Sequence, residues 1–259
     1  MKIKQLNKTI KRTLGALFIA FATSLSLTTQ ATIVQFETVL GNFEVNLYDD
    51  MTPETVANFL AYVDAEDYNN AIFHRSVANF VIQGGGFAYN NEWPVSTIDA
   101  NAPVINEARA SNVYGTIAMA KVANNPDSAT NQWFINVADN SANLDYQNGG
   151  FTVFGEVMGD GMQIVEQIAT LPRFNLGGAL AELPLQNYDG TGDPNGDHLV
   201  IITRIRVIDE ATDTAANANP LLIQPPEAPD DVASSSGGSG SFNFVLLTLM
   251  ALAGLGRKK

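Results

Sequence analysis

Fifteen residues from Phe73 to Phe87 constrain the fold of this chain more than any other stretch; their sequence is FHRSVANFVIQGGGF. Residues 71–75 and 80–83 run apolar or alternate in polarity, which predicts two short strands joined by a turn. Three consecutive glycines follow, and glycine lets the backbone turn sharply or approach another group closely. The stretch therefore predicts a hairpin that ends in a tight bend.

The polar side chains of this hairpin have predictable directions. Side chains two residues apart on a strand point to the same face, so we expect Arg75 beside Phe73 and Gln83 beside Val81. An arginine in apolar surroundings needs hydrogen-bond partners or water, because burying it without them is costly. His74 is expected on the opposite face, which favours a structural role over that of a general base. Taken alone, Arg75 also fits a surface position at a strand end.

The composition disfavours several kinds of function. The chain has no cysteine and two histidines, which leaves little for a zinc site or a catalytic triad. Eight of its 14 cations lie in the first 31 and last three residues, so the remainder carries six cations against 27 acids. This acidic body is expected not to bind nucleic acid, because phosphate binding needs clustered lysine and arginine.

Residues 1–31 have the layout of a secretory signal peptide. Five cations precede an apolar run from Leu14 to Leu27, and the segment ends on the small residue Ala31. The run is shorter than the ~20 residues that a membrane-spanning helix needs. We therefore expect cleavage after Ala31 and export of the body, with a retained membrane anchor as the alternative.

Residues 32–209 are expected to form one mainly β domain. The predicted strands, besides the hairpin above, cover residues 33–38, 43–47, 113–119, 132–137, 152–157 and 199–207. One helix is expected to begin at Thr52 and Pro53, because apolar residues follow at helical spacing, and a second is expected over residues 160–169 with Asp160 as its cap. Many short strands with two separated helices indicate an antiparallel β-barrel with a helix at each end.

The loop from Asp189 to Asp197 has oxygen-bearing side chains at alternate positions and invites a calcium interpretation. It lacks the glycine and glutamate positions of a calcium-binding hand. The same residue types are typical of turns. We expect a turn-rich loop and no metal, with calcium left open.

The C-terminal part changes composition twice. Residues 210–241 are rich in Ala, Pro, Asp, Ser and Gly and predict a flexible linker. Residues 242–259 are an apolar run with a basic end, and a helix of its apolar part would reach about 22 Å, short of the ~30 Å hydrocarbon core. The glycine-serine run and this tail resemble the GlyGly-CTERM sorting signal of Gram-negative bacteria. That resemblance implies a temporary anchor, cleaved near the glycines; a permanent inner-membrane anchor is the alternative.

Four ordered segments resemble the cyclophilins, a family of peptidyl-prolyl cis-trans isomerases. They are the stretch from Phe73, GTIAMA at 115–120, NQWFIN at 131–136, and NLD at 143–145 followed by VFG at 153–155. The resemblance covers about residues 32–209. It implies a closed eight-stranded antiparallel β-barrel capped by two α-helices.

The resemblance also implies a site. Arg75 matches the guanidinium that reaches the prolyl amide, and Gln83 matches the amide that orients it. Ala120 and Lys121 match positions whose backbone pairs with the peptide. The substrate-binding positions implied are Phe80, Val81, Ala120, Lys121, Gln132, Phe134, Leu144 and Phe151.

The chain departs from the family pattern at four positions. Val81 stands where members commonly have Met, which makes the socket for the proline ring shallower. Lys121 replaces the usual Asn in a contact made mainly by the backbone. Phe151 keeps an aromatic wall where many eukaryotic members have His. Asn143 replaces the Trp that contacts cyclosporin in eukaryotic members, which predicts weak binding of that drug.

The predicted function is isomerisation of Xaa-Pro bonds in unfolded or extended polypeptides during the folding of exported proteins. The expected protein is a monomer without a cofactor, in the periplasm or at the surface of a Gram-negative bacterium. One alternative is a peptide-binding chaperone or surface scaffold that uses the same groove with little turnover. Another is a surface protein whose function lies in its acidic loops and tail.

Overall fold

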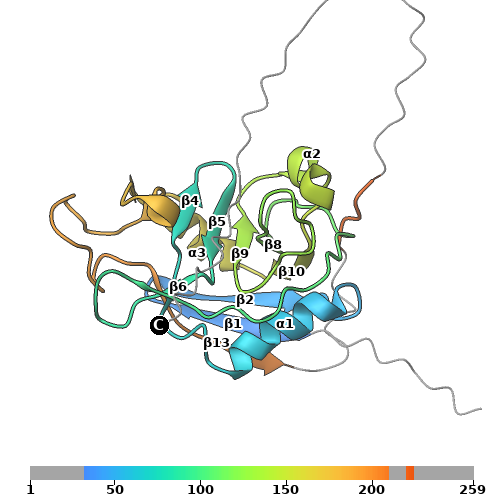
Figure 1. Cartoon of the computed structure of the whole chain (residues 1–259), viewed down its shortest axis with the longest axis horizontal. Helices are drawn as coiled ribbons and strands as arrows, with labels where there is room; N and C mark the ends of the chain where they lie inside the picture. Colours follow the sequence, from blue (N-terminus) through green and yellow to red (C-terminus); the bar gives the residue numbers. More distant parts are fainter. Residues whose placement is uncertain (1–31, 210–219, 225–259) are drawn as a thin grey trace, which may run out of the picture.

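The computed structural model describes residues 32–209 and 220–224 (Figure 1). The predicted signal peptide, most of the predicted linker and the apolar tail lie outside the described residues. The helices are α1 (Pro53–Asp64), α2 (Ser141–Leu144) and α3 (Gly161–Ala169), with 3-10 turns η1 (Gln147–Gly149) and η2 (Gly178–Leu180). The main-sheet strands are β1 (Ile33–Thr38), β2 (Gly41–Leu47), β3 (Ala71–Ile72), β4 (Arg75–Val77), β5 (Val81–Gly84), β6 (Phe87–Ala88), β7 (Ser96–Thr97), β8 (Thr116–Met119), β9 (Trp133–Asn136), β10 (Val153–Val157) and β13 (Ile201–Asp209); β11 (Arg173–Phe174) and β12 (Leu183–Pro184) form a separate pair.

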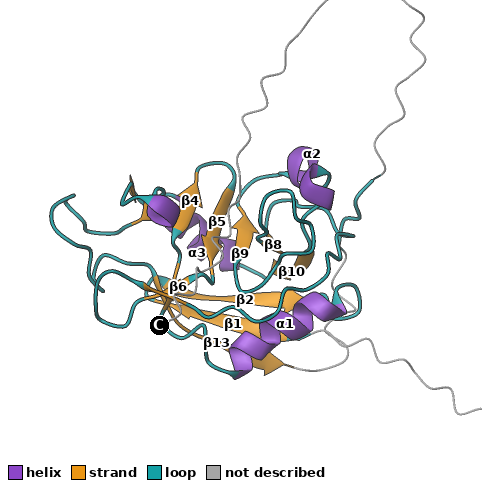
Figure 2. Ribbon diagram, viewed as in Figure 1, coloured by secondary structure: helices purple, strands orange, loops and turns teal. Residues whose placement is uncertain are grey.

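The main sheet has 11 strands in the order β4-β5-β9-β8-β10-β2-β1-β13-β3-β6-β7, and all its pairs are antiparallel. Figure 2 shows β4, β5 and β9 crossing steeply to the direction of β1 and β2, so the sheet curls as a half-barrel. The expected closed eight-stranded barrel is wrong.

The reason lies where one strand was expected over residues 71–75. The chain forms β3, which pairs with β13, and then β4, which pairs with β5. Between them, Phe73 donates its N–H to Val200 O and His74 donates to Gln83 O. The chain therefore passes from β3, ninth in the strand order, to β4 at its first position without a continuous ladder.

Both expected helices are confirmed, but neither is capped as the sequence suggested. Thr52 and Asp160 make no side-chain cap bond. Glu107, from the long segment before β8, instead accepts from Thr55 N–H at 2.9 Å and from Thr55 Oγ1 at 2.8 Å. A carboxylate at this position satisfies a free backbone donor and is favoured by the helix dipole.

Alternate residues of the central strands face two different apolar clusters. Ile82, Trp133 and Ile135 belong to the main core, on which α1 and α3 pack. Val81 and Phe134 belong to a second cluster on the opposite face of the sheet. This period of two is the one that a pleated strand imposes.

The expectation that Phe73 and Arg75 share one face of the sheet is wrong. Its ring lies 5.6 Å from that of Trp133, edge-on, in the main core. Arg75, expected on the same face, instead reaches Gln83 on the opposite side of the sheet. The bend between β3 and β4 breaks the strand alternation on which that expectation depended.

The polar side chains of the loop 189–197 form hydrogen bonds within the loop itself. Asp189 accepts from the N–H and the hydroxyl of Thr191, and Asn195 accepts from Asp197 N–H. Across the described residues there is no group of three or more His, Cys, Asp or Glu side chains placed to hold a metal ion. Within residues 32–209 and 220–224, no helix has the length and apolar character to cross a membrane.

Candidate functional site

The strand register aligns the predicted site residues in a row across the sheet. Arg75 on β4 lies opposite Gln83 on β5, and Gln83 lies opposite Phe134 on β9. Phe134 in turn lies opposite Ala118 on β8. Directly opposed residues have Cβ atoms about 4.5–5.5 Å apart, so their side chains touch. The row therefore places a cation and an amide directly beside an aromatic floor.

Arg75 is held by an amide rather than by a carboxylate. Its Nη1 donates to Gln83 Oε1 at 3.4 Å, and Gln83 Nε2 donates to Gln132 Oε1 at 2.9 Å. No carboxylate lies within ion-pair distance of Arg75 in the described part of the chain. Burial lowers the pKa of Arg75, and Glu182 acts in the opposite direction. The half-buried guanidinium keeps N–H donors available for a substrate oxygen or nitrogen.

The apolar residues assigned to the socket come together in one cluster. The rings of Phe134 and Phe151 meet edge-on with centroids 5.8 Å apart. Phe80, Val81 and Leu144 belong to the same cluster, and all five residues are buried. Flat aromatic surfaces with few polar atoms suit the ring of a proline residue.

The three glycines that end and follow β5 lie against β9 and the residues just before it. A Cβ at Gly84 would lie 2.8 Å from the Trp133 ring, and one at Gly86 would lie 2.8 Å from the side chain of Gln132. Gly85 has φ +81°, and a Cβ there would lie 2.3 Å from Asn131 O. Any side chain in this run would push β5 away from β9 and disturb the row that contains Gln83.

Ala120 and Lys121 follow β8 at the edge of the cluster. Ala120 donates its N–H to Gln132 O at 2.9 Å. The N–H of Lys121 has no hydrogen bond within the described residues, and Val122 N–H is satisfied by Ser128 Oγ at 2.8 Å. A free backbone donor at Lys121 fits the expected pairing with a peptide.

The side chain of Lys121 has a role that the sequence did not indicate. It is 1% exposed, and its Nζ donates to Asn106 Oδ1 at 3.1 Å, Asn148 O at 3.0 Å and Gly150 O at 2.5 Å. The ammonium also lies 4.9 Å from the centre of the Phe151 ring. Burial lowers the pKa of Lys121 to about 8, against a raising effect of Asp127. Lys121 therefore fixes the turn that leads into the Phe151 wall.

A second support, also missed, holds the turn from the other side. Asp145 accepts from Ser111 Oγ at 2.5 Å, from Asn112 N–H at 2.8 Å and from Asn112 Nδ2 at 3.0 Å. Asn112 Nδ2 also donates to Phe151 O at 3.1 Å. Asp145 directly follows Leu144, so these bonds position two socket residues. The NLD motif contains Asp145, but nothing in the sequence identified Ser111 and Asn112 as its partners.

His74 is buried beside Phe87 and Gln132, next to this row. It is 2% exposed and its ring meets that of Phe87 with centroids 5.0 Å apart. Burial, with a smaller effect of the neighbouring Arg75, lowers the pKa of His74 to about 3. His74 is therefore neutral near pH 7, which agrees with the structural role expected for it.

An arginine and glutamine beside an aromatic floor, on one face of a curled antiparallel sheet, define a class of domain suited to bind a peptide around an apolar ring. Residues 33–188 match the family model "Cyclophilin type peptidyl-prolyl cis-trans isomerase/CLD". This match covers more than half of the sequence, and the chain belongs to that family.

Individual relatives agree with the family match. A peptidyl-prolyl cis-trans isomerase of Acinetobacter baylyi is 45% identical over 149 residues, which are 56% of this chain and 76% of the relative. Isomerase B of Escherichia coli is 43% identical over 142 residues, 52% of this chain and 83% of the relative. The crystal structure of a cyclophilin type isomerase of Cryptosporidium parvum shares the fold, with a TM-score of 0.52 and 21% identity over 69% of this chain and 98% of that chain.

Proposed function

We propose that this chain accelerates cis-trans isomerisation of Xaa-Pro bonds, with Arg75 as the residue that acts on the amide. The observation that carries the proposal is the arginine held by Gln83 beside the Phe134 floor, without a carboxylate partner in the described part of the chain. Curated relatives named peptidyl-prolyl cis-trans isomerase, 41–45% identical to this chain, support it.

Rotation about the prolyl bond has a barrier of ~18–20 kcal/mol, because the C–N bond has partial double-bond character. In the twisted amide the nitrogen regains a lone pair and the carbonyl loses its conjugation. A guanidinium N–H that donates to this nitrogen stabilises the twisted form more than either planar form. Binding that favours the transition state over the ground state is what raises the rate.

The other residues of the site bind and orient the substrate. Phe134 and Phe151 receive the proline ring, so that the flanking peptide rotates against a fixed ring. The backbone of Lys121 pairs with the peptide, and Gln83 and Gln132 hold the guanidinium in place before rotation begins. A donor that is already oriented needs no reorganisation during the reaction.

The test is prolyl exchange in an Ala-Pro-Phe peptide, measured by NMR with the full chain and its Arg75→Ala variant. Loss of the oriented donor is expected to lower kcat/KM about a hundredfold or more. Arg204→Ala is the matched control, because the side chain of Arg204 on β13 is exposed and bonds Glu37, so its loss should leave the rate unchanged. Equal rates in wild type and Arg75→Ala would refute the role of Arg75. Peptide binding without any acceleration would favour the chaperone or scaffold function.

We also propose that the protein is exported and acts on polypeptides that fold outside the cytoplasm. The proposal rests on the layout of residues 1–31 and on the sorting-signal resemblance of residues 234–259. The mass of the protein recovered from periplasm, membrane and cell surface would show whether cleavage follows Ala31 and whether the tail is removed. A full-length chain in the cytoplasm would contradict export.

A further inference from the structure

Residues 220–224 lie within the predicted linker, yet they pair with the domain as a strand. Ser111 N–H donates to Leu221 O at 2.7 Å, and Ile223 N–H donates to Arg109 O at 3.0 Å. These two bonds flank an antiparallel bridge between Ala110 and Leu222. The segment thus adds backbone pairing to a stretch of chain that has no other strand neighbour assigned to it in the described residues.

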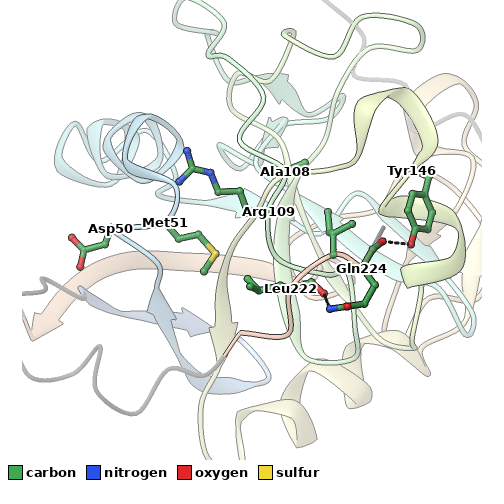
Figure 3. Close-up of a pocket in the computed structure, with 8 residues that line it drawn as sticks. Asp50, Met51, Ala108, Arg109, Tyr146, Leu222 and Gln224 are labelled. Carbon is green, nitrogen blue, oxygen red and sulfur yellow. Dashed lines mark hydrogen bonds between the residues drawn. The ribbon is translucent and has the colours of Figure 1, made fainter. Parts of the chain in front are cut away.

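One side-chain bond fixes the far end of this segment. Tyr146 donates its hydroxyl to Gln224 O at 2.8 Å, as Figure 3 shows. Tyr146 directly follows Asp145, in the turn that leads from Leu144 to Phe151. The added segment therefore contacts both the strand-like stretch 109–111 and the turn that forms the socket wall.

Backbone bonds, rather than side-chain burial, hold the segment in place. Leu221 is 57% exposed and Leu222 is 51% exposed. Between the segment and the domain lies an open cleft of about 860 Å³, lined by Asp50, Met51, Ala108, Arg109, Tyr146, Leu222, Ile223 and Gln224 (Figure 3). A segment seated by so few apolar contacts can be released by removing single hydrogen bonds.

The stretch under the segment leads directly to the site. Ser111 Oγ donates to Asp145, and the neighbouring Asn112 donates to both Asp145 and Phe151 O. A shift of the stretch 109–112 would therefore move the carboxylate that holds Leu144 and the carbonyl of Phe151.

We propose that Pro220–Gln224 is an internal docking strand that completes the peptide site by fixing the Leu144–Phe151 wall. The surface that accepts it consists of Arg109–Ser111 and Tyr146, and its partner is an extended segment of the same chain. The part of the proposal that concerns substrate rests on the proposed isomerase function. Because the segment is tethered to β13 through residues 210–219, its docking is intramolecular and needs little affinity per contact.

The experiment compares two proline substitutions in the full chain. Ile223→Pro removes the N–H that donates to Arg109 O. Leu222→Pro is the matched control, because in an antiparallel pair the N–H of the intervening residue points away from the partner strand. Both variants keep the extended conformation that a proline favours, and they differ by one bond to the domain.

Amide hydrogen exchange at Ser111 measures docking whether or not the protein is an active isomerase. Exchange at Ser111 is expected to be at least about tenfold faster in Ile223→Pro and unchanged in Leu222→Pro. Equally slow exchange in Ile223→Pro would overturn docking.

The NMR signals of the Leu144 methyl groups and the affinity for the Ala-Pro-Phe peptide measure the effect on the site. Ile223→Pro is expected to shift those signals and to weaken peptide binding about three- to tenfold, the range of one lost hydrogen bond. Tyr146→Phe, which removes the bond to Gln224 O, should also shift the Leu144 signals and weaken peptide binding. Faster exchange at Ser111 with unchanged Leu144 signals and affinity would overturn the positioning role, and this result is separate from the Arg75→Ala result that tests the isomerase.

Discussion

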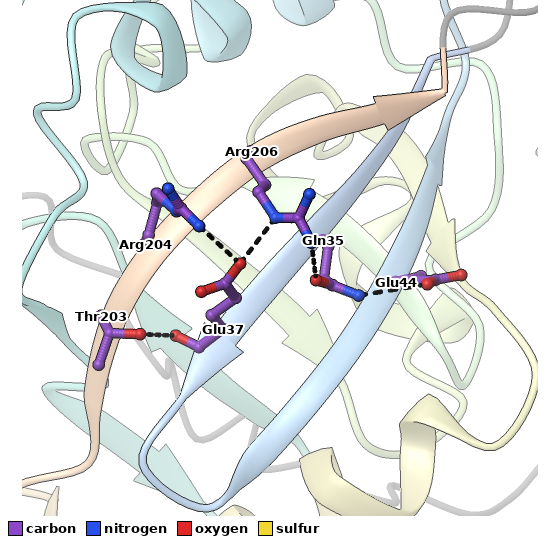
Figure 4. Close-up of polar contacts among 6 residues, drawn as sticks. All are labelled: Gln35, Glu37, Glu44, Thr203, Arg204 and Arg206. Carbon is purple, nitrogen blue, oxygen red and sulfur yellow. Dashed lines mark hydrogen bonds and ion pairs between the residues drawn. The ribbon is translucent and has the colours of Figure 1, made fainter.

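The cations of the site and those of strand β13 are held in opposite ways. On β13, Arg204 and Arg206 both bond Glu37 Oε1, at 3.1 Å and 2.7 Å (Figure 4). In the site, Arg75 and Lys121 bond only neutral amide and carbonyl oxygens within the described residues. One pair of cations shares a carboxylate partner, and the other pair has none within ion-pair distance in the described residues.

The pKa values follow this difference. The hydrogen bonds from Arg206 and Arg204 lower the pKa of Glu37, as expected for a carboxylate beside two cations. Burial lowers the pKa of both Arg75 and Lys121, and this effect exceeds the opposite effects of Glu182 on Arg75 and of Asp127 on Lys121. In a body with six cations and 27 acids, two cations without an ion-pair carboxylate in the described residues, Arg75 and Lys121, thus lie at the proposed site.

The largest expected effect concerns His74, the buried neutral neighbour of Arg75. Its folded-state pKa is about 3, whereas the unfolded value is about 6.5. Between these values the unfolded chain binds a proton that the folded chain does not, so the free energy of unfolding falls as pH falls from 6.5 toward 3. The limit is about 1.4 kcal/mol per pH unit, or about 5 kcal/mol in all.

Urea titrations between pH 7 and pH 4 measure this slope. His74→Phe should be less sensitive to pH in that window, since it removes the titrating group but keeps a ring beside Phe87. An identical slope in wild type and His74→Phe would contradict the assignment.

The next effect comes from giving Arg75 the partner that Arg206 has. Gln83→Glu places a carboxylate where the amide oxygen now lies, 3.4 Å from Arg75 Nη1. The ion pair would satisfy the guanidinium in the free enzyme and withdraw it from the prolyl nitrogen, so kcat/KM is expected to fall about a hundredfold.

The measurement is prolyl exchange by NMR at pH 7, with circular dichroism to verify the fold. Gln83→Met serves as the control for loss of the amide without a new charge, and it should be less impaired than Gln83→Glu. If the two variants lose activity equally, the absence of a carboxylate beside Arg75 has no special importance.

Lys121→Met should have a moderate effect. The methionine keeps contact with Phe151 but leaves the carbonyls of Asn148 and Gly150 without their donor, which loosens the turn before the wall. We expect KM to rise about three- to tenfold with kcat little changed, as for the loss of one or two buried hydrogen bonds.

The pH dependence separates Lys121 from a merely structural residue. In wild type, KM should rise as pH increases past about 8, because the neutral amine has two donors for three acceptors. Lys121→Met should lack this rise. A rise of the same size in both proteins would assign the titration to another group.

Glu37→Gln should have the smallest effect of the series. Exposed ion pairs contribute little to the free energy of unfolding, because water and salt screen them. The melting temperature is therefore expected to change by a few degrees at most, and the isomerase activity should stay at the wild-type level. Calorimetry at low and high salt measures it. A large fall in the melting temperature would show that the bonds of Glu37 to Arg204 and Arg206 stabilise the domain more than expected for exposed ion pairs.

The sequence predicted the elements whose signals are local. The helix stripe that follows Pro53 and the strands over residues 33–38 and 43–47 depend on short-range patterns, and all are found in the structure. The grouping of Phe80, Phe134 and Leu144 was implied by the cyclophilin resemblance, and the structure brings these residues into one cluster. Whether each acts on substrate stays a prediction.

What the sequence did not predict depends on contacts between distant residues. The cap of α1 is Glu107, 52 residues from Thr55, and no local pattern marks that pair. The side chain of Lys121 reaches carbonyls in a turn 27 and 29 residues away. The bend at Phe73 comes with two bonds to distant residues, because Phe73 N–H donates to Val200 O and the adjacent His74 N–H donates to Gln83 O.

Residues 106–112 form no helix or strand, yet their side chains hold several parts of the domain in place. Asn106 binds Lys121, Glu107 caps α1, and Ser111 and Asn112 hold Asp145. An insertion in this irregular stretch during evolution would disrupt three contacts at once: the cap of α1 by Glu107, the bond of Asn106 to Lys121, and the bonds of Ser111 and Asn112 to Asp145. The exposed loop 189–197, whose turns bond mainly within themselves, is free to vary in length, so new loop sequences on this domain can arise there without disturbing the site.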